Sequence, residues 1–144
     1  MPLKTEITFR AATLADCPLL AVLNHQLIQD EGNRNPMTVL QLEQRMRGFL
    51  GDGYRAVIYE ADGEVVAYAL FREQPEEIYL RHLFVVRHRR RQGMGREAVE
   101  ILRSKIWPKT KRLTVEVLVG NRTAAAFWRA VGYTDYSLLL EMMP

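Results

Sequence analysis

The chain has 144 residues, 48% of them hydrophobic and 26% charged, which suits one globular domain with a single core and excludes a disordered chain. Its single cysteine, Cys17, excludes an internal disulfide, and no apolar run approaches the ~20 residues of a membrane span. The N-terminus lacks a signal-peptide pattern, so we expect one domain over residues 1–144, in the cytoplasm and not in a membrane.

The first third of the chain predicts a strand followed by two helices. Residues 6–11 alternate between polar and apolar side chains, as in a strand near the edge of a sheet. A capping-box pattern at residues 13–16 predicts the start of a helix that ends at Gly32. Thr38 and Gln41 repeat this pattern, so we expect a second helix after them.

The middle of the chain predicts an antiparallel hairpin and a third strand. Residues 54–60 and 64–71 are rich in β-formers, and only a short turn separates them. Residues 78–86 form the next apolar segment, which we expect to be the central strand of the sheet.

The last third predicts a helix, a strand, a second helix and a final strand. Trp107-Pro108 ends the first of these helices, and alternating apolar residues over 113–119 form the strand. Asn121 is a candidate N-cap, and Gly132 sits where a helix C-cap is expected. With a last strand over 134–142, the order is β-α-α-β-β-β-α-β-α-β, an α/β fold with a mixed sheet flanked by helices.

Residues 87–96, called the arginine loop below, combine four arginines and a histidine over 87–91 with Gly93, Gly95 and a fifth arginine, Arg96, directly before a helical pattern. Glycines allow the backbone to approach a ligand closely, and the free N–H groups at a helix start attract phosphate. Arginines add bidentate hydrogen bonds to phosphate oxygens. The loop therefore predicts a site for a ligand with several phosphates, and it holds much of the positive charge of a chain with net charge +3.

Two other interpretations of this loop are open. Residues 93–98 match the dinucleotide fingerprint Gly-x-Gly-x-x-Gly/Ala, and Glu116 lies about 20 residues further on, where a ribose-binding acid is expected. Against this, the preceding strand is the fourth and not the first, and Glu116 falls inside an alternating strand. The basic cluster at 87–91 could also bind nucleic acid, but it has no interleaved aromatic residues, so we expect no nucleic-acid partner.

Two motifs resemble the GNAT N-acetyltransferase family. Arg90-x-x-Gly93-x-Gly95 after an apolar strand looks like the family's coenzyme A loop, and the block at residues 121–133 resembles its next signature. The likeness spans residues 78–133 and implies a GNAT-like acyl-CoA N-acyltransferase fold. It also implies transfer of an acetyl group from acetyl-CoA, as cosubstrate and without a metal, to a primary amine of a small molecule or peptide.

The resemblance also implies binding residues. The main chain of the central strand would pair with the pantetheine arm of coenzyme A, the arginine loop would hold the pyrophosphate, and the last helix would flank the thioester. The implied coenzyme residues are Phe84, Val85, Val86, Arg90, Arg91, Gln92, Gly93, Met94, Gly95, Arg96, Asn121, Phe127 and Trp128. The acceptor would lie between the first two helices and the central strand, near Asn24, His25, Gln29, Asp30, Asn33, Arg34 and Arg81.

The catalytic residues are less clearly marked. Where family members often carry a Glu or His on the central strand, this chain has Tyr79 and Arg81. Glu77 shares their face by alternation and is the first candidate base, whereas His82 points to the opposite face unless a bulge intervenes.

The family's thiolate-protonating tyrosine is replaced by Trp128, whose indole N–H is a donor but not a usable acid, so Tyr133 and Tyr136 are candidate substitutes. These departures leave a non-catalytic acyl-CoA-binding or regulatory module as the alternative function. We also expect a possible homodimer, because Tyr133 to the end of the chain is long enough for only one further strand.

Overall fold

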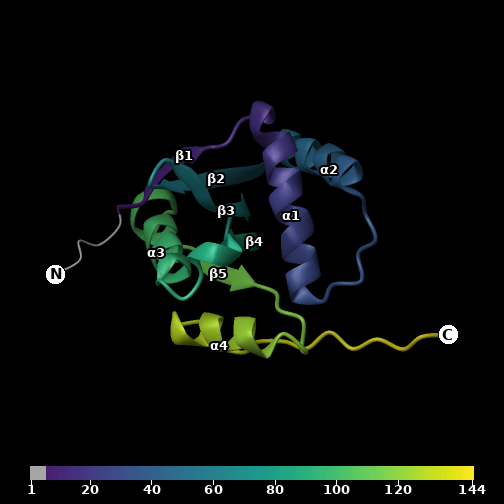
Figure 1. Ribbon diagram of the computed structural model, residues 1–144. Coiled ribbons are helices and arrows are strands. Elements are labelled where there is room, and N and C mark those ends of the chain that lie inside the picture. The colour runs from purple at the N-terminus through teal and green to yellow at the C-terminus, as the bar shows by residue number, and fades with distance from the viewer. Residues whose placement is uncertain (1–5) are drawn as a thin grey trace.

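The computed structural model describes residues 6–144, which form one mixed sheet of five strands between helices (Figure 1). The strands are β1 (Thr8–Ala11), β2 (Tyr54–Ala61), β3 (Glu64–Glu73), β4 (Glu77–Val85) and β5 (Arg112–Val115). They lie in sequence order, with antiparallel pairing from β1 to β4 and parallel pairing between β4 and β5. The expected α/β class with a mixed sheet is confirmed.

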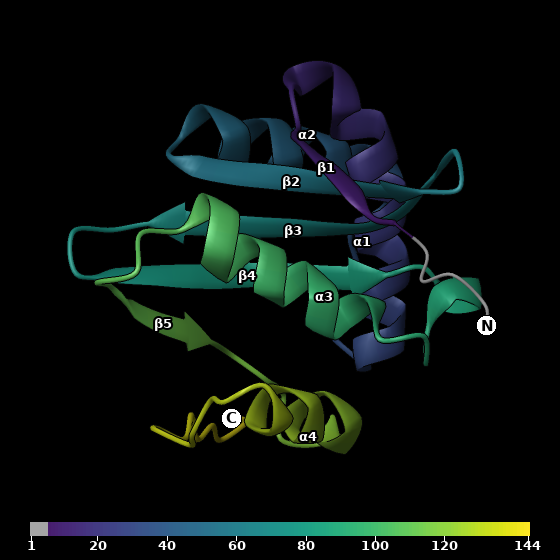
Figure 2. The ribbon, with the colours of Figure 1, turned by 90° about the vertical axis from the view of Figure 1, so that its left-hand side faces the viewer.

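The helices cover both faces of this sheet. They are α1 (Cys17–Glu31), α2 (Val39–Gly51), α3 (Met94–Ile101) and α4 (Arg122–Ala130). In Figures 1 and 2, α1 and α2 lie on one face, α3 on the other, and α4 beside β5. One turn of 3-10 helix, Arg87–Arg89, precedes α3, and a π-helical turn, Leu102–Ile106, extends it.

The predicted caps explain where helices begin and end. Thr38 Oγ1 accepts a hydrogen bond from the Gln41 amide at 3.2 Å before α2. Asn121 Oδ1 accepts one from the Ala124 amide at 3.2 Å before α4. Gly32 ends α1 in the left-handed conformation, with φ of 67°, which glycine adopts without steric cost. No helix in the part of the chain that the structure describes is long and apolar enough to cross a membrane.

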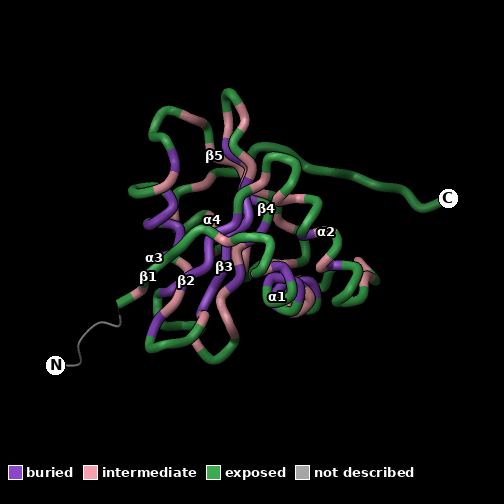
Figure 3. Tube along the Cα trace, turned by 90° about the horizontal axis from the view of Figure 1, so that it is seen from above, coloured by how far each residue is buried: buried purple, intermediate pink, exposed green. Residues whose placement is uncertain are grey.

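The core has two main parts, one on each face of the sheet (Figure 3). Under α3 it contains Tyr59, Phe71, Ile78, Leu80 and Trp107. Under α1 and α2 it contains Leu20, Met46, Ile58, Tyr68 and Phe84. Burial on both faces fixes the register of the central strands, because a shift by one residue would exchange the two sets.

A bulge in β4 changes which side chains face α1 and α2. Phe71 of β3 pairs with Leu80, but the preceding residue of β3, Leu70, pairs with His82, so Arg81 is an extra residue. Before the bulge, Leu80 packs into the core under α3, whereas beyond it Phe84 packs into the core under α1. His82 therefore faces α1 and α2, as Tyr79 does. Simple alternation would have placed it on the other face.

The predicted last strand is wrong for the chain on its own. Residues 133–144 have no regular secondary structure, and Leu139 is 95% exposed. β5 is also shorter than predicted, because it ends at Val115 and Val119 is 91% exposed. A β-rich segment forms a strand only where a neighbouring backbone is available for pairing, and composition alone does not supply one.

Candidate active site

The parallel strands β4 and β5 separate about halfway along β4. Pairing between β4 and β5 covers Glu77 to Leu80 and stops at Leu80 with Val115. From Arg81 onward, the edge of β4 that faced β5 has no strand partner (Figure 2). This open edge leads directly into the arginine loop.

Alternation along β4 shows which main-chain groups face the open edge. The Val86 amide donates to the Val66 carbonyl at 2.9 Å, toward β3. Because main-chain N–H and C=O groups alternate in direction along a strand, those of Phe84 also point toward β3, and those of Leu83 and Val85 point to the open edge. Of the three residues expected to pair with a pantetheine arm, Val85 is thus placed to do so. Leu83, which sequence reasoning left out, could have been found by counting alternate residues from Val85.

The arginine loop presents the free end of α3. Gly93 has φ of 77° and precedes the helix, and the first hydrogen bond inside α3 runs from the Glu97 amide to the Gly93 carbonyl at 3.0 Å. The amides before Glu97 therefore have no acceptor within the helix and can donate to an anion. Arg91 also has a positive φ, 63°, which turns the loop tightly enough to bring these amides together.

Asp30 at the end of α1 holds two arginines of the loop. Arg87 Nη2 lies 2.7 Å from Asp30 Oδ1, and Arg90 Nη2 lies 2.6 Å from Asp30 Oδ2. Burial acts to raise the pKa of Asp30, but the hydrogen bonds from the two guanidinium groups outweigh it, so the pKa is lowered. Asp30 was expected to bind the acceptor, and the structure instead places it against the arginine loop.

The Arg90 side chain also crosses the open edge of β4. Its Nε donates to the Val85 carbonyl at 2.9 Å, and its guanidinium lies 5.2 Å from the centre of the Phe84 ring. Arg90 therefore occupies one of the main-chain acceptors that a bound ligand would use.

The remaining side chains of the loop differ in their contacts. Arg89 binds Glu64 at 2.7 Å and Asp62 at 2.9 Å, and His88 Nε2 also lies 2.9 Å from Glu64. Gln92 Nε2 donates to the His88 carbonyl at 3.4 Å.

Arg91 and Arg96 make no ion pair with any residue in the range 6–144. These two cations are thus available to an incoming anion.

The N-terminal end of α3 packs against α4. A Cβ atom on Gly95 would lie 3.2 Å from the Phe127 ring, so only glycine allows this approach without a shift. Phe127 in turn contacts Trp128 edge-on at 4.9 Å between ring centres. The expected thioester-flanking residues Phe127 and Trp128 therefore lie close to the arginine loop, and the Asn121 carbonyl oxygen caps α4.

Tyr133 lies at the other end of this contact. Its ring packs edge-on against Trp128 at 5.3 Å, and its hydroxyl is buried without a hydrogen-bond partner among the described residues. Burial raises the pKa of Tyr133 to about 12, with a smaller opposing effect of Arg103 beyond α3. The hydroxyl is therefore near the end of α3 that lies away from the arginine loop.

The bulge brings His82 to the acceptor side of β4. Its Nδ1 shares a hydrogen bond of 3.2 Å with the Tyr68 hydroxyl. Burial, followed by the positive charges of Arg45 and Arg81, lowers the pKa of His82 to about 3, so the imidazole is neutral at pH 7.

Glu77, the first candidate base, is bound to β5. Its Oε2 accepts hydrogen bonds from Arg112 Nη1 and Thr114 Oγ1, each at 3.3 Å. It also lies before the point at which β4 and β5 separate. The carboxylate is therefore engaged at the paired end of the strand.

The predicted acceptor residues only partly come together. Asn24 is 1% exposed, and its Oδ1 accepts from Arg45 Nη2 at 3.1 Å. Arg45 and Arg81 both stack on Phe49, with 5.3 and 4.9 Å from each guanidinium carbon to the ring centre. Arg45 and Phe49 were missed by sequence reasoning, although their i, i+4 spacing on α2 puts them on one helix face.

Other candidates stay outside this group. His25 is half-buried and Gln29 exposed on α1, and their side chains make no hydrogen bond or ion pair with any described residue. Arg34 binds Glu141 of the C-terminal segment at 2.7 Å, and Asn33 Oδ1 accepts from the Asn35 amide at 3.0 Å. No group of three or more His, Cys, Asp or Glu side chains in residues 6–144 could hold a metal ion.

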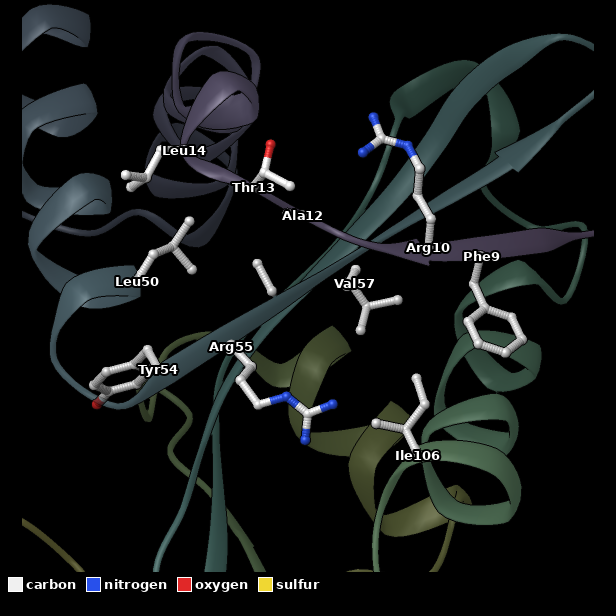
Figure 4. Close-up of a pocket in the computed structure, with 12 residues that line it drawn as sticks. Phe9, Arg10, Ala12, Thr13, Leu14, Leu50, Tyr54, Arg55, Val57 and Ile106 are labelled. Carbon is white, nitrogen blue, oxygen red and sulfur yellow. The ribbon is translucent and has the colours of Figure 1, made fainter.

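A separate cavity of about 420 Å³ lies toward the start of β2, between the ends of β1, α2 and the π-helical turn (Figure 4). Arg55, Leu50 and Ile106 are among its lining residues. Tyr54, which lines this cavity, lies opposite Arg72 of β3, and Arg72 lies opposite Tyr79 near the beginning of β4. The cavity is therefore at the opposite end of the sheet from the arginine loop.

Comparison with solved structures agrees with this geometry. An aminoglycoside N-acetyltransferase in complex with CoA superposes with a TM-score of 0.77 at 14% identity over 100% of this chain and 98% of that one. A predicted acetyltransferase with acetyl-CoA from Clostridium acetobutylicum gives 0.73 at 16% identity, over 96% of each chain. A ribosomal-protein-alanine N-acetyltransferase from Brucella melitensis biovar Abortus 2308 gives 0.71 at 15%, over 96% and 100%.

At these identities the structural likeness establishes the fold. No curated protein matches the sequence significantly. The model of the acetyltransferase (GNAT) family matches residues 20–133, which include most of α1, all of α2 to α4 and the arginine loop. The chain therefore belongs to the acetyltransferase (GNAT) family.

Proposed function

We propose that this protein transfers an acetyl group from acetyl-CoA to a primary amine. One observation carries the proposal: the open edge of β4 leads without interruption into the arginine loop and the free amides of α3. A ligand with an amide-containing arm and a pyrophosphate matches that order of groups. Family membership and the CoA-containing structures of similar fold support the same ligand.

The coenzyme would be held by main-chain and charged groups together. Leu83 and Val85 would pair with the amides of the pantetheine arm, and the amides of residues 93–96 would bind the pyrophosphate. Arg91 and Arg96 are free to contact its oxygens, whereas Arg90 must first leave the Val85 carbonyl and Asp30. Phe127 and Trp128 would flank the thioester end.

Proton transfer would rest on positioning more than on a strong base. An alkylamine of pKa near 10.4 is neutral in only about one molecule in 10³ at pH 7. His82, with a pKa of about 3, is too weak a base to store its proton. We propose that the site selects the neutral amine, and that His82 and Tyr79 orient it toward the carbonyl carbon. The rate at low acceptor concentration should then rise about tenfold per pH unit between pH 7 and 9.

A thermal-shift titration with CoA, acetyl-CoA and NADH, together with a thiol-release assay over a panel of amines, tests this function. CoA at 100 times its dissociation constant should stabilise the protein by about 2.7 kcal/mol. A shift with NADH alone would contradict the coenzyme assignment.

A non-catalytic acyl-CoA-binding module is the second candidate, favoured by the engagement of Glu77 with Arg112 and by Trp128 at the family's tyrosine position. Thermal stabilisation by acetyl-CoA without thiol release from any amine would support that function. The buried free thiol of Cys17 fits a reducing compartment such as the cytoplasm, which we propose as the location.

We also propose a homodimer in which residues 137–143 of one copy pair with β5 of the other. This segment is largely apolar and exposed, with Leu139 at 95% and Met142 at 94%, and the outer edge of β5 pairs with no strand that the structure describes. Just before this segment, Asp135 forms an ion pair with Arg129 of α4 at 2.8 Å. Light scattering should give twice the chain mass, and Leu139→Lys should give a monomer. A monomeric wild type would contradict the proposal.

A further inference from the structure

Two arginines lie side by side near the bulge of β4. The guanidinium groups of Arg45 on α2 and Arg81 on β4 lie against the same Phe49 ring, at 5.3 and 4.9 Å from its centre. Neither forms an ion pair with any residue between 6 and 144. Two positive charges against one ring repel each other, and in the described chain no ion-paired carboxylate offsets that repulsion.

The donors around these arginines are also unsatisfied. Arg45 Nη2 donates to Asn24 Oδ1 at 3.1 Å, but the buried Arg45 Nε atom has no hydrogen-bond partner in the described chain. The buried Asn24 Nδ2 atom lies near the Tyr68 hydroxyl, whose pKa burial raises and Asn24 acts to lower by a smaller amount, but it forms no hydrogen bond of good geometry with a described residue. Asn24 is 1% exposed, so water does not reach its amide freely. Buried donors normally have an acceptor, and a group of them without one indicates that a ligand supplies it.

Two carboxylates also act on Tyr79. Burial raises the pKa of Tyr79, and the next contribution is the negative charge of Glu116, followed after Arg81 and Tyr54 by that of Glu31. Both carboxylates are thus within electrostatic range of the Tyr79 hydroxyl, and neither is paired with Arg45 or Arg81. The acceptor side of β4 therefore carries both positive and negative groups that are not paired with each other.

We propose that the acceptor is an amine that also carries an anionic oxygen group, a carboxylate or a phosphate. Arg45, Arg81 and the Asn24 amide bind that anionic group, and the amino group lies toward Tyr79 and the open edge of β4. Two planar guanidinium groups can each form bidentate hydrogen bonds with such oxygens. The same pair disfavours a polycationic acceptor, which would bring further positive charge to it. This inference rests on the proposed acetyl transfer.

Matched acceptors test the anionic group directly. We would measure thiol release with acetyl-CoA for glycine against glycinamide, 4-aminobutyrate against its amide, and phosphoethanolamine against ethanolamine. Each pair is compared at pH values that give equal fractions of neutral amine. A charge-assisted bond predicts a kcat/KM at least about tenfold higher for the acidic member. Preference in the first two pairs identifies a carboxylate, and preference in the third identifies a phosphate.

Variants connect the preference to the two arginines. Arg81→Gln should raise KM for the acidic member about tenfold or more and leave its neutral partner within about twofold. Arg45→Gln should act in the same direction, but it also removes a bond to buried Asn24, so Arg81→Gln is the decisive variant. Arg55→Gln is the control, because Arg55 stacks on Phe71 at 5.3 Å on the other face of the sheet. Equal use of both members, or an equal loss for both in Arg81→Gln, would overturn the inference.

Binding separates this inference from the proposed function. If no amine releases thiol, the transfer reaction has failed, and calorimetric titration with N-acetylglycine and with inorganic phosphate then judges the anion site. Binding that is lost in Arg81→Gln and kept in Arg55→Gln would support the site without the reaction. Absence of binding to wild-type protein would reject it.

Discussion

Replacing Asp30 with Asn should strengthen coenzyme A binding. Without ligand, Asp30 binds Arg87 at 2.7 Å and Arg90 at 2.6 Å, and Arg90 also donates to the Val85 carbonyl. The carboxylate thus occupies guanidinium groups that a pyrophosphate would use. Both ion pairs must be exchanged when the coenzyme enters, and Asp30→Asn removes much of that competition.

The magnitude follows from the exposure of the pairs. The Arg87 and Arg90 side chains are 61% and 39% exposed, against 22% for Asp30, so solvent screens both interactions. An exposed ion pair changes an equilibrium constant by roughly 1.5- to 5-fold, so two pairs predict about 2- to 25-fold tighter CoA binding. The cost should be a lower melting temperature, by a few degrees at most.

The pH dependence has a defined sign. The folded-state pKa of Asp30 is lowered, so its stabilising contribution is fully present above the unfolded value of about 3.9 and is lost as the pH falls through the folded value. The difference in melting temperature between wild type and Asp30→Asn should therefore be largest near neutral pH. It should also shrink at high salt, which screens exposed pairs.

Isothermal titration with CoA at pH 7 measures the change. Asp135→Asn is the matched control, because Asp135 makes a comparable exposed pair with Arg129, at 2.8 Å, outside the arginine loop. It should lower the melting temperature slightly and leave CoA affinity unchanged. Unchanged or weaker CoA binding in Asp30→Asn would refute competition between Asp30 and the pyrophosphate.

Three further changes test other parts of the structure. Gly95→Ala should lower the free energy of unfolding by about 1 kcal/mol, because overpacking against Phe127 at 3.2 Å exceeds the helical gain, and it should weaken CoA binding. Gly48→Ala in α2 is the control, because a Cβ atom there would meet open space, and it should raise the free energy of unfolding. Urea titration measures the free energy of unfolding of both variants. A Gly95→Ala variant more stable than wild type would disprove the close contact with Phe127. The folded protein holds His82 neutral, with its pKa lowered by burial, whereas in the unfolded chain it gains a proton below about pH 6.5. The free energy of unfolding of wild type should therefore fall by about 2 kcal/mol between pH 7 and 5. His82→Phe should lose less over this interval in urea titrations, whereas an equal loss would show that His82 is not the group responsible. Trp128→Tyr should change thiol release by no more than about twofold, because a thiol of pKa near 8.5 leaves without an acid; a tenfold faster variant would show that the missing acid limits the rate.

Local signals in the sequence were sufficient for most elements. The caps at Thr38 and Asn121 act on residues three positions away, so the sequence alone specifies them. The hairpin of β2 and β3 follows from a short turn between β-rich segments. The arginine loop was predictable because its arginines, glycines and helix start are contiguous.

Tertiary pairing decided what the sequence left open at β4. The bulge at Arg81 depends on how β3 pairs with β4, which no local pattern encodes, and it turns His82 toward α1 and α2. The approach of Arg45 and Arg81 to one Phe49 ring joins α2 to β4 across the chain. The contact of Asp30 with Arg87 and Arg90 likewise exists only after α1 packs beside the end of β4.

The C-terminal segment shows the same division. Its β-rich composition predicted a strand over 134–142, yet a strand also needs a neighbouring backbone to satisfy its N–H and C=O groups. No strand among residues 6–136 pairs with residues 137–143, which stay exposed. The sequence by itself determined which segments can pair and which loop can bind phosphate. Only the tertiary structure decided which pairings form and which side chains meet, because those contacts join residues far apart in the chain.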